Sequence, residues 1–545
     1  MEITRLIVKN FKGIKSADVN FHSGANILVG DNGVGKSTII EALQLVLGDG
    51  IRQLDITHFL FHQSTWKEFD ETKALPKIEV EVFFSYDESL EEYKGKMNSQ
   101  HIDAVGIRMV IDCSEEGRVL LNSNKDHYAQ IPSEYYAYSR MWFSGAMVSQ
   151  WMVPYYTIVV DSSTPFFLSK ADYLATKIMT ERLSNQDKVN LRKALHRVGA
   201  SFADDEFVKK LKLELSQGSR ELTFNIDMES NKVGNMIIKP FLDEIPYNQI
   251  GLGEQNIIKT LLSIDKGHQT SKKFQILIVE EPESHLSHTK MRELMAVLSS
   301  IEGQAIISTH NSFVANRLDL KNVIMLSKDN EGKISSQPFD SLSNSTTSYF
   351  QKAANYPTLR LVLCQKAILV EGPADEMIIE YYFKKNGMPS PIEQGIELIC
   401  VNGLMFKYFI EIAKCLNKKV AVITDNDGQT MNDVSKRYLN QDEKDINVFT
   451  CPDPQLNTLE PCFVRANISR LQELSNFIRI RQKANDTEQD LVNYMEDHKT
   501  EWSFKVYNSL NDEKQEGNEQ INDNASNKRW DFPQYIKDAI EWILT

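Results

Sequence analysis

Residues 26–38 read NILVGDNGVGKST, and this stretch decides the fold of the first half of the chain. The apolar residues 27–29 predict a buried strand, residues 30–37 match the pattern GxxxxGK(S/T), and residues 39–47 have helical spacing. The glycines allow consecutive backbone N–H groups to curve around an anion, and the N-terminus of the helix adds its positive dipole end. The stretch is therefore predicted to be a P-loop that binds ATP.

The P-loop assignment gives its polar side chains specific tasks. Lys36 can reach the β- and γ-phosphates of ATP, and the Ser37 hydroxyl can ligate Mg²⁺. The expected ATP-binding positions in this loop are Gly30, Asn32, Gly33, Gly35, Lys36, Ser37 and Thr38. The alternative is a glycine-rich turn that matches by chance, but strand, glycines, lysine, hydroxyl and helix occur together, which favours nucleotide binding.

Length and composition limit the class of protein. The 545 residues are too many for one hydrophobic core, so about three domains are expected. The net charge of −14 argues against a generally basic nucleic-acid-binding surface, although a local basic channel or a bound metal could still contact nucleic acid. Six cysteines without a CxxC pair support neither a zinc ribbon nor a disulfide framework. Because no signal-peptide core or membrane-spanning run is found, a cytoplasmic protein without membrane association is expected.

Alternating, β-branched and aromatic segments predict further strands. They lie at residues 2–9, 17–21, 77–86, 105–111, 155–160 and 221–226. Between about residues 169 and 218 the pattern becomes helical and highly charged, which indicates either a solvated helical insertion or a dimerisation arm. The polar, low-complexity stretch 511–527 is expected to be a loop.

Two later segments supply the remaining parts of an ATPase. Residues 276–286, ILIVEEPESHL, predict a buried strand that ends in Glu280 and Glu281. Glu280 is expected in the Mg²⁺ shell, and Glu281 is expected to polarise the attacking water. Residues 305–312, AIISTHNS, predict another strand, after which His310 can sense the γ-phosphate. A histidine at the end of a strand is usually structural, but its position one strand–helix unit after the acidic pair favours the catalytic interpretation.

Residues 250–256, IGLGEQN, precede a helical pattern and can bind the phosphate of a nucleotide held by another subunit. The expected contacts are Gly251, Gly253 and Gln255. Together these motifs resemble the ABC-type ATPase head of SMC-like and recombination-repair ATPases, which implies two heads that enclose two ATP molecules and therefore a homodimer or higher homo-oligomer. Leu252 stands where this class usually has a serine, and this departure weakens the expectation of tight closure between two subunits or of fast hydrolysis. Gln53 and Gln63 both remain candidates for the Q-loop glutamine.

A second group of acidic residues follows two more apolar strands. Residues 366–376 read KAILVEGPADE, and residues 420–428 read VAVITDNDG. Alternate residues of a strand point to opposite faces, so Asp425 and Asp427 can face one site only if the strand has already ended. Asn426 and Gly428 make such a turn plausible. Acidic side chains at the ends of parallel strands form an oxygen-rich cluster, which suits Mg²⁺ or Mn²⁺.

The glutamate followed by DxD resembles a TOPRIM domain, and a TOPRIM domain behind an ABC-type head resembles the overcoming-lysogenisation-defect (OLD) family of nucleases. The resemblance also includes TLEP at residues 458–461 and KRWDFPQYIKDAIEWI at residues 528–543. It implies a metal-dependent DNA nuclease, commonly in antiphage defence, in some cases with a helicase or retron partner. The metal shell that it implies is Glu371, Asp375, Asp425, Asp427 and Glu460. Glu371 is also a candidate general base, and Lys528 is the expected phosphate-neutralising lysine, with Arg529 and Lys537 nearby.

The expected fold class is α/β, with an ABC-type P-loop ATPase domain that carries a helical insertion, followed by a Rossmann-like TOPRIM domain. The expected boundaries are residues 1–165 and 221–345 for the ATPase domain, 166–220 for the insertion and 360–545 for the TOPRIM domain with its helical C-terminal region. The main alternative function is a DNA-repair or chromosome-organising ATPase whose TOPRIM domain is structural or regulatory. A primase is disfavoured because no zinc module is present, and a type I topoisomerase is disfavoured because no room remains for a tyrosine domain.

Overall fold

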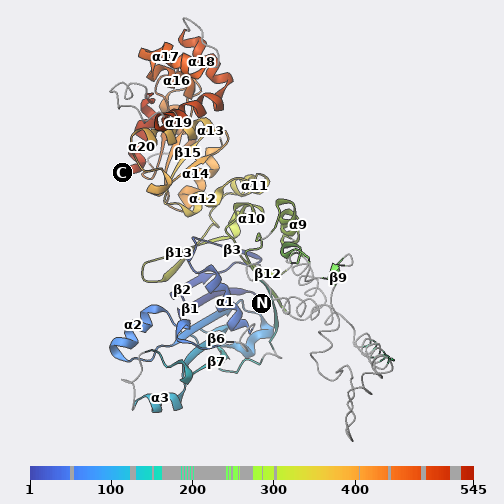
Figure 1. Cartoon of the computed structure of the whole chain (residues 1–545). Helices are drawn as coiled ribbons and strands as arrows, with labels where there is room; N and C mark the ends of the chain where they lie inside the picture. Colours follow the sequence, from blue (N-terminus) through green and yellow to red (C-terminus); the bar gives the residue numbers. More distant parts are fainter. Residues whose placement is uncertain are drawn as a thin grey trace. The chain divides into compact units, whose positions relative to one another are not determined.

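The computed structural model (Figure 1) describes most of the chain. The described residues are 1–48, 54–122, 130–149, 153–161, 274–284, 286–299, 303–403, 405–439, 443–479, 487–515 and 530–545, with isolated residues between 186 and 257. They divide into two compact units. The first contains residues 1–309 and 326–336, and the second contains residues 310–325 and 337–545.

A large mixed sheet forms the framework of the first unit (Figure 1). Its strands, as far as they are described, are β1 (Ile3–Phe11), β2 (Ile14–Asn20), β3 (Ala25–Val29), β4 (Ile78–Phe84), β5 (Lys94–Gly95), β6 (Ala104–Cys113), β7 (Tyr136–Trp142), β8 (Tyr155–Asp161), β11 (Phe274–Glu280), β12 (Gln304–Ser308), β13 (Val323–Lys328) and β14 (Lys333–Pro338). The order is β5-β6-β4-β1-β2-β14-β13-β3-β12-β11-β8, and β7 pairs with β6. The strands predicted at residues 2–9, 17–21, 77–86, 105–111 and 155–160 are confirmed, whereas the one at residues 221–226 lies outside the described residues.

The sheet has an antiparallel part and a parallel part. β1 pairs antiparallel with β2 and β4, and β4 pairs antiparallel with β6. β3, β12, β11 and β8 form a parallel run, since β12 pairs parallel with β3 and β11, and β11 pairs parallel with β8. Because the carboxyl ends of parallel strands share one edge, the loops that follow β3, β12 and β11 are brought to the same side of the sheet.

In its described part the first unit has four α-helices, of which α1 packs against the sheet. They are α1 (Lys36–Leu47), α2 (Gln63–Thr72), α3 (Glu115–Asn122) and α9 (His288–Leu298). In α1 the apolar residues Ile39, Ile40, Leu43 and Val46 are buried, and the helix packs against β1, β4 and β6. Most of the charged stretch 169–218 lies outside the described residues. Two short strands, β9 (Phe241–Leu242) and β10 (Ile245–Pro246), are described by their backbone only and pair antiparallel.

The second unit contains a parallel sheet of four described strands in the order β16-β15-β17-β18. Their bounds are β15 (Lys366–Val370), β16 (Ile396–Cys400), β17 (Lys419–Ile423) and β18 (Ile446–Phe449). The last four residues of β15 and of β17 are buried, as expected for a parallel sheet covered on both faces. This arrangement confirms the Rossmann-like sheet predicted for the C-terminal part.

The helices of the second unit are α10 (Ser312–Arg317), α11 (Asn344–Lys352), α12 (Thr358–Leu363), α13 (Pro373–Lys385), α14 (Phe406–Cys415), α15 (Met431–Tyr438), α16 (Leu459–Ala466), α17 (Leu471–Ile478), α18 (Glu488–Asp497), α19 (Lys499–Gln515) and α20 (Gln534–Leu544). α13, α16, α18, α19 and α20 contribute to one apolar core with β15 and β17. The prediction of a loop at residues 511–527 is wrong for residues 511–515, which continue α19. No described helix combines the length and the apolar character that crossing a bilayer requires.

Candidate nucleotide site and acidic centre

The P-loop has the backbone that its glycines require. Gly33 and Gly35 have φ values of +79° and +112°, in the left-handed region that favours glycine. A Cβ atom at Gly35 would lie 2.9 Å from Ile334 Cδ1, and one at Gly30 would lie 2.7 Å from the Leu326 carbonyl oxygen. The sequence therefore folds into a tight strand–loop–helix turn here, with α1 starting at Lys36 directly after the left-handed Gly35.

Lys36 is the buried cation of this loop. Its Nζ donates hydrogen bonds to the carbonyl oxygens of Gly30 (2.7 Å) and Asp31 (3.1 Å), so the ammonium is held over the loop. Burial lowers the pKa of Lys36, and the charges of Glu281, Asp31 and Glu283 oppose this shift. Ser37 and Asn32 are exposed, and Thr38 is half-buried, so these polar positions remain accessible to a ligand.

The acidic pair after β11 lies two strands from the P-loop strand. Glu280 ends β11 in register with Ser308 of β12, and the Glu281 backbone N–H donates to the Ser308 carbonyl oxygen at 3.0 Å. Glu281 has a φ of +44°, a conformation that bulky residues rarely adopt. The charge of Glu281 opposes the lowering of the pKa of Lys36 that burial causes. The edge shared by the parallel strands thus brings together two motifs that are about 245 residues apart in the sequence.

Glu283 is an acidic residue of this edge to which the sequence analysis gave no role. Thr309 Oγ1 donates a hydrogen bond to Glu283 Oε1 at 2.6 Å, which joins the loop after β11 to the end of β12. Glu283 is the last residue of the sequence EEPE. Only the first two glutamates of this sequence stand directly at the end of the predicted strand, so Glu283 was given no role. His310 is the second residue after β12 and falls in the second compact unit, so its proposed contact with the γ-phosphate remains a prediction.

The segment predicted to contact a second nucleotide begins a helical turn. Gln255 is buried, and its side-chain amide donates to the Ile250 carbonyl oxygen at 2.7 Å, whereas Leu252 is 38% exposed. Gly251 is exposed and Gly253 is buried. The Q-loop question stays open, because Gln53 lies outside the described residues and Gln63 begins α2. His62 caps that helix, since its Nδ1 accepts a hydrogen bond from the Ser64 backbone.

The second group of acidic residues gathers at the carboxyl ends of β15 and β17. Val370 and Ile423 are paired in register, so Glu371 and Asp425 leave the sheet at the same edge. Glu371 Oε1 accepts hydrogen bonds from the Thr424 hydroxyl and from the Asp425 backbone N–H, the latter at 2.8 Å. The Glu371 carboxylate is therefore held by the loop that carries Asp425.

Asp375 and Asp425 are partly buried and lie next to other acids. Asp375 lies in the first turn of α13, where its Oδ2 accepts a hydrogen bond from the Gly372 backbone at 3.1 Å. Burial, and then the Glu371 charge, raise the pKa of Asp375 to about 7. Burial, and then the charges of Glu371, Asp375 and Glu460, raise the pKa of Asp425 to about 9. Four of the predicted metal ligands therefore share one electrostatic environment.

Glu460 and Lys499 complete this environment. Glu460 lies in α16 with 1% of its surface exposed, and its Oε2 accepts no hydrogen bond from any described residue. The Lys499 Nζ lies 3.8 Å from that oxygen, and its charge opposes the rise in the pKa of Asp425. Lys499 is the first residue of α19, and its side chain is about half exposed. No motif in the sequence pointed to Lys499.

The DxD turn has the form that the sequence predicted. β17 ends at Ile423, and Asp427 has a φ of +50°, so the strand ends and the chain turns before the second aspartate. Asn426 is buried, and its side chain donates to the carbonyl oxygens of Cys451 (3.0 Å) and Asp453 (2.9 Å). Asp427 itself is half exposed and pairs with Arg437 of α15 at 3.2 Å.

The complete set of metal ligands remains a prediction. Within the described part of the chain, no three acidic, histidine or cysteine side chains are arranged as a ready-made metal shell. Lys528 and Arg529 lie outside the described residues, and Lys537 lies in α20.

Comparisons with known proteins agree with this domain composition. Residues 1–137 match the AAA ATPase domain, residues 178–316 match the AAA domain described as a putative AbiEii toxin of a type IV TA system, and residues 362–427 match the TOPRIM domain of overcoming-lysogenization-defect-like proteins. The two sheets therefore belong to an ATPase joined to a TOPRIM domain.

Two curated proteins are similar over most of the chain. The OLD nuclease of Thermus scotoductus is 22% identical over 465 residues, which cover 78% of this chain and 82% of that protein. The endonuclease GajA of Bacillus cereus is 22% identical over 458 residues, which cover 78% and 75%. Among solved structures, the SMC head domain from Thermotoga maritima covers 62% of this chain and 99% of its own, at 17% identity and a TM-score of 0.29. The chain thus has the ATPase-plus-TOPRIM composition of OLD proteins, and the predicted resemblance is confirmed.

Proposed function

We propose that this protein is an ATP-binding, metal-dependent DNA endonuclease that hydrolyses phosphodiesters at the acidic centre of its TOPRIM domain. The observation that carries the proposal is the group of carboxylates at the ends of β15 and β17, where burial, and then the charges of Glu371, Asp375 and Glu460, raise the pKa of Asp425 to about 9. Like charges at such a site are costly unless a proton or a cation compensates them. The relatives named OLD nuclease and endonuclease GajA support the same activity.

The acidic centre fits a hard divalent cation. Its donors are carboxylate oxygens, and the buried Glu460 Oε2 accepts no hydrogen bond from a described residue, as a ligand atom awaiting a cation would. We expect Mg²⁺ or Mn²⁺ to be held by Glu371, Asp375, Asp425, Asp427 and Glu460. When bound, a pair of such ions activates water and stabilises the leaving oxygen of a phosphodiester.

The protein's own groups supply orientation and charge. The Thr424 hydroxyl and the Asp425 backbone fix Glu371 Oε1, so the second oxygen of Glu371 is available to hold a metal or to accept a proton from water. Lys499 places a flexible ammonium beside Glu460, where it can reach an incoming phosphate oxygen. We propose Lys499 as the phosphate-neutralising lysine. Lys528, which the resemblance to the OLD family suggests, is the alternative candidate.

The first unit would regulate cleavage by binding ATP-Mg²⁺. The P-loop backbone and Lys36 would hold the phosphates, Ser37 and Glu280 would complete the Mg²⁺ shell, and Glu281 would polarise water. His310 would sense the γ-phosphate, and Gly251, Gly253 and Gln255 of a second copy would close on the nucleotide. This arrangement implies a homodimer or a higher homo-oligomer.

We further propose that the protein acts in the cytoplasm in antiphage defence, alone or with a partner such as a helicase or a retron component. The support for this role, and for DNA as the substrate, is the OLD resemblance together with the relatives named OLD nuclease and endonuclease GajA. The intact acidic residues favour catalysis over a purely structural TOPRIM domain.

Incubation of the purified protein with supercoiled, linear and single-stranded DNA, in Mg²⁺ or Mn²⁺, tests the activity. Wild-type protein should cut at least one of these substrates, and EDTA should stop the reaction. Glu371→Ala should eliminate cleavage while ATP affinity stays unchanged, because Glu371 lies in the other compact unit from the P-loop. Cleavage by Glu371→Ala at close to the wild-type rate would contradict the proposal.

A further inference from the structure

A pocket of about 360 Å³ lies in the second unit beside the edge strand β16. Its walls come from α12, α13, α19, β16 and the loop after α13, and its size is in the range of small-molecule sites. The lining residues are Arg360, Glu376, Glu380, Phe383, Lys384, Met388, Ser390, Pro391, Ile392, Ile396, Glu397, Leu398 and Tyr507. None of them is among the predicted nucleotide or metal ligands.

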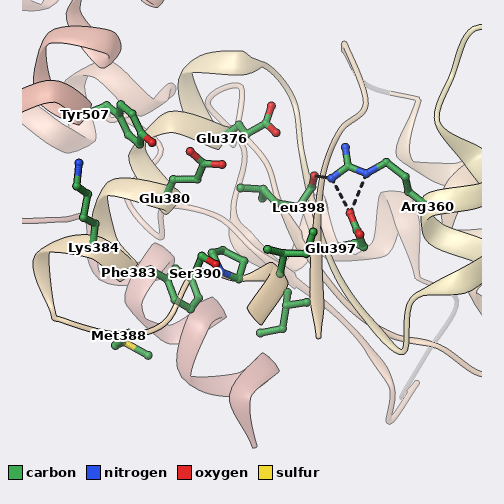
Figure 2. A pocket seen from close by; sticks show the side chains of 13 residues that line it. Arg360, Glu376, Glu380, Phe383, Lys384, Met388, Ser390, Glu397, Leu398 and Tyr507 are labelled. Carbon is green, nitrogen blue, oxygen red and sulfur yellow. Dashed lines mark hydrogen bonds and ion pairs between the residues drawn. The ribbon is translucent and has the colours of Figure 1, made fainter. Parts of the chain in front are cut away.

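The charged groups of the pocket occupy one side of it. Figure 2 shows the carboxylates of Glu376 and Glu380 between Tyr507 and the pair formed by Arg360 and Glu397. In that pair, Arg360 Nε donates to Glu397 Oε2 at 2.8 Å, so the guanidinium charge is already compensated. Arg360 also donates to the Leu398 carbonyl oxygen at 3.1 Å, which fixes the guanidinium against β16.

The two carboxylates of α13 are one helical turn apart on the face that lines the pocket. Both carboxylates are partly buried in the wall of the pocket. Lys384 lies a further turn along the helix, with its Nζ 5.1 Å from the ring centre of Tyr507. The lining holds three carboxylates and two cationic side chains, which leaves one net negative charge.

The rest of the lining is apolar. Phe383, Ile396 and Leu398 are buried, whereas Met388 is partly buried and Ile392 is 69% exposed, which marks their side of the pocket as its mouth. An anion would meet a lining that carries one net negative charge, and a small hydrated ion would gain nothing from these apolar walls. A ligand that complements both features has one positive charge at the end of an apolar chain.

We propose that this pocket binds a single organic cation, a primary amine or a guanidinium, on an aliphatic body that contacts Phe383, Ile396 and Leu398. The cationic head would lie between Glu376 and Glu380, where it forms charge-assisted hydrogen bonds. The same chemistry is offered by a free alkyl amine and by a lysine or arginine side chain of a partner. This proposal does not depend on the nuclease activity.

Calorimetry with hexylamine at low ionic strength tests the pocket directly, because salt screens such contacts. Hexylamine should bind at least about 10-fold more tightly than hexanol or hexanoate, given the strength of hydrogen bonds to charged groups. Comparison with the tripeptide acetyl-Leu-Lys-Leu-amide distinguishes the sources. Tighter binding of the peptide assigns the pocket to a partner's side chain, and tighter binding of the amine assigns it to a free ligand.

Substitutions test whether hexylamine binds in this pocket. Glu376→Gln should weaken hexylamine binding about 10-fold or more, and Met388→Trp, which fills the mouth without changing charge, should also weaken it. Glu496→Gln, a matched change at an exposed position of α18, and Asp425→Asn in the acidic centre should leave it unchanged. Equal binding of hexanol and hexylamine, or wild-type affinity in both Glu376→Gln and Met388→Trp, would overturn the proposal. Loss of binding in Asp425→Asn would instead place the amine at the acidic centre and would also overturn it.

Discussion

Lys36 is the residue whose proposed role follows most directly from local sequence. Its neighbours fix its position through the backbone alone, since left-handed glycines shape the loop and Lys36 Nζ rests on the carbonyl oxygens of Gly30 and Asp31. Such a site depends on contacts within about ten residues, which is why it could be predicted without the structure. By contrast, the contact between Thr309 and Glu283 depends on the pairing of β11 with β12, which the sequence does not specify residue by residue.

Replacement of Lys36 by alanine should remove ATP binding. The ammonium is held where it can contact two phosphates, and each charge-assisted hydrogen bond of this kind contributes roughly 1.5–3 kcal/mol. Calorimetry should therefore show a loss of affinity of about 100-fold or more. Glu281→Gln is the matched control, because it should still bind ATP and should slow its hydrolysis. Wild-type affinity in Lys36→Ala would exclude the P-loop assignment.

The buried acids should make the stability of the metal-free protein depend on pH. Folding raises the pKa of Asp375 to about 7 and that of Asp425 to about 9, above the value near 4 of an unfolded aspartate. Between pH 4 and pH 9 the folded state therefore holds more protons than the unfolded state, so the free energy of unfolding falls as pH rises. The loss is at most about 1.4 kcal/mol per pH unit for each proton released.

Thermal melting in EDTA at pH 6 and pH 9 measures this effect. Asp425→Asn stays neutral at every pH, so its Tm should fall less than that of the wild type over this interval. The difference should be about 2–4 °C for each kcal/mol in a unit of this size. Mn²⁺ should reduce the fall in the wild type. Asp497→Asn, at an exposed position of α18, serves as the control, and parallel curves for wild type and Asp425→Asn would contradict the prediction.

At the scale of elements, the sequence identified the strands that carry the acids but not the helix that carries the nearby cation. β15 and β17 are apolar runs followed directly by acidic residues, and their parallel pairing brings Glu371 and Asp425 together. Lys499 is 74 residues beyond Asp425 in a charged helical region without a motif. It reaches Glu460 because α16, α18 and α19 pack together, and long-range packing of this kind leaves no local signal.

Lys499→Ala should slow DNA cleavage at saturating enzyme by about 10²–10³-fold, the usual cost of losing one donor to a developing negative charge. DNA affinity should change little. Lys444→Ala, at an exposed position before β18, is the matched control, and Lys528→Ala tests the candidate from the family resemblance. If Lys499→Ala regains the full rate at high enzyme concentration, Lys499 only anchors the DNA backbone, and slow cleavage by Lys528→Ala would then assign the catalytic role to Lys528.

At the scale of the whole molecule, the order of the motifs predicted the order of the two folds, and each fold has its own sheet and core. The path of the chain between them was not evident from the sequence. Residues 310–325 belong to the second compact unit, because α10 packs against α11 and α12, and residues 326–336 then return to the first unit. Alternating strand patterns are the same whichever sheet a strand joins, so no pattern could place β13 and β14.

Substitution of Leu252 tests the proposal that the ATPase units of two copies close around ATP. Leu252 is 38% exposed and stands where ABC-type heads usually present a serine to the γ-phosphate of the facing subunit. An aliphatic side chain cannot donate that hydrogen bond, so closure of two copies around ATP should be weak in the wild type. Leu252→Ser in a Glu281→Gln background, which should retain ATP, is expected to increase the dimer fraction with ATP-Mg²⁺ by light scattering. Leu252→Ala is the control for side-chain size alone. An equal dimer fraction in the serine and alanine variants would show that position 252 does not contact the nucleotide across the interface.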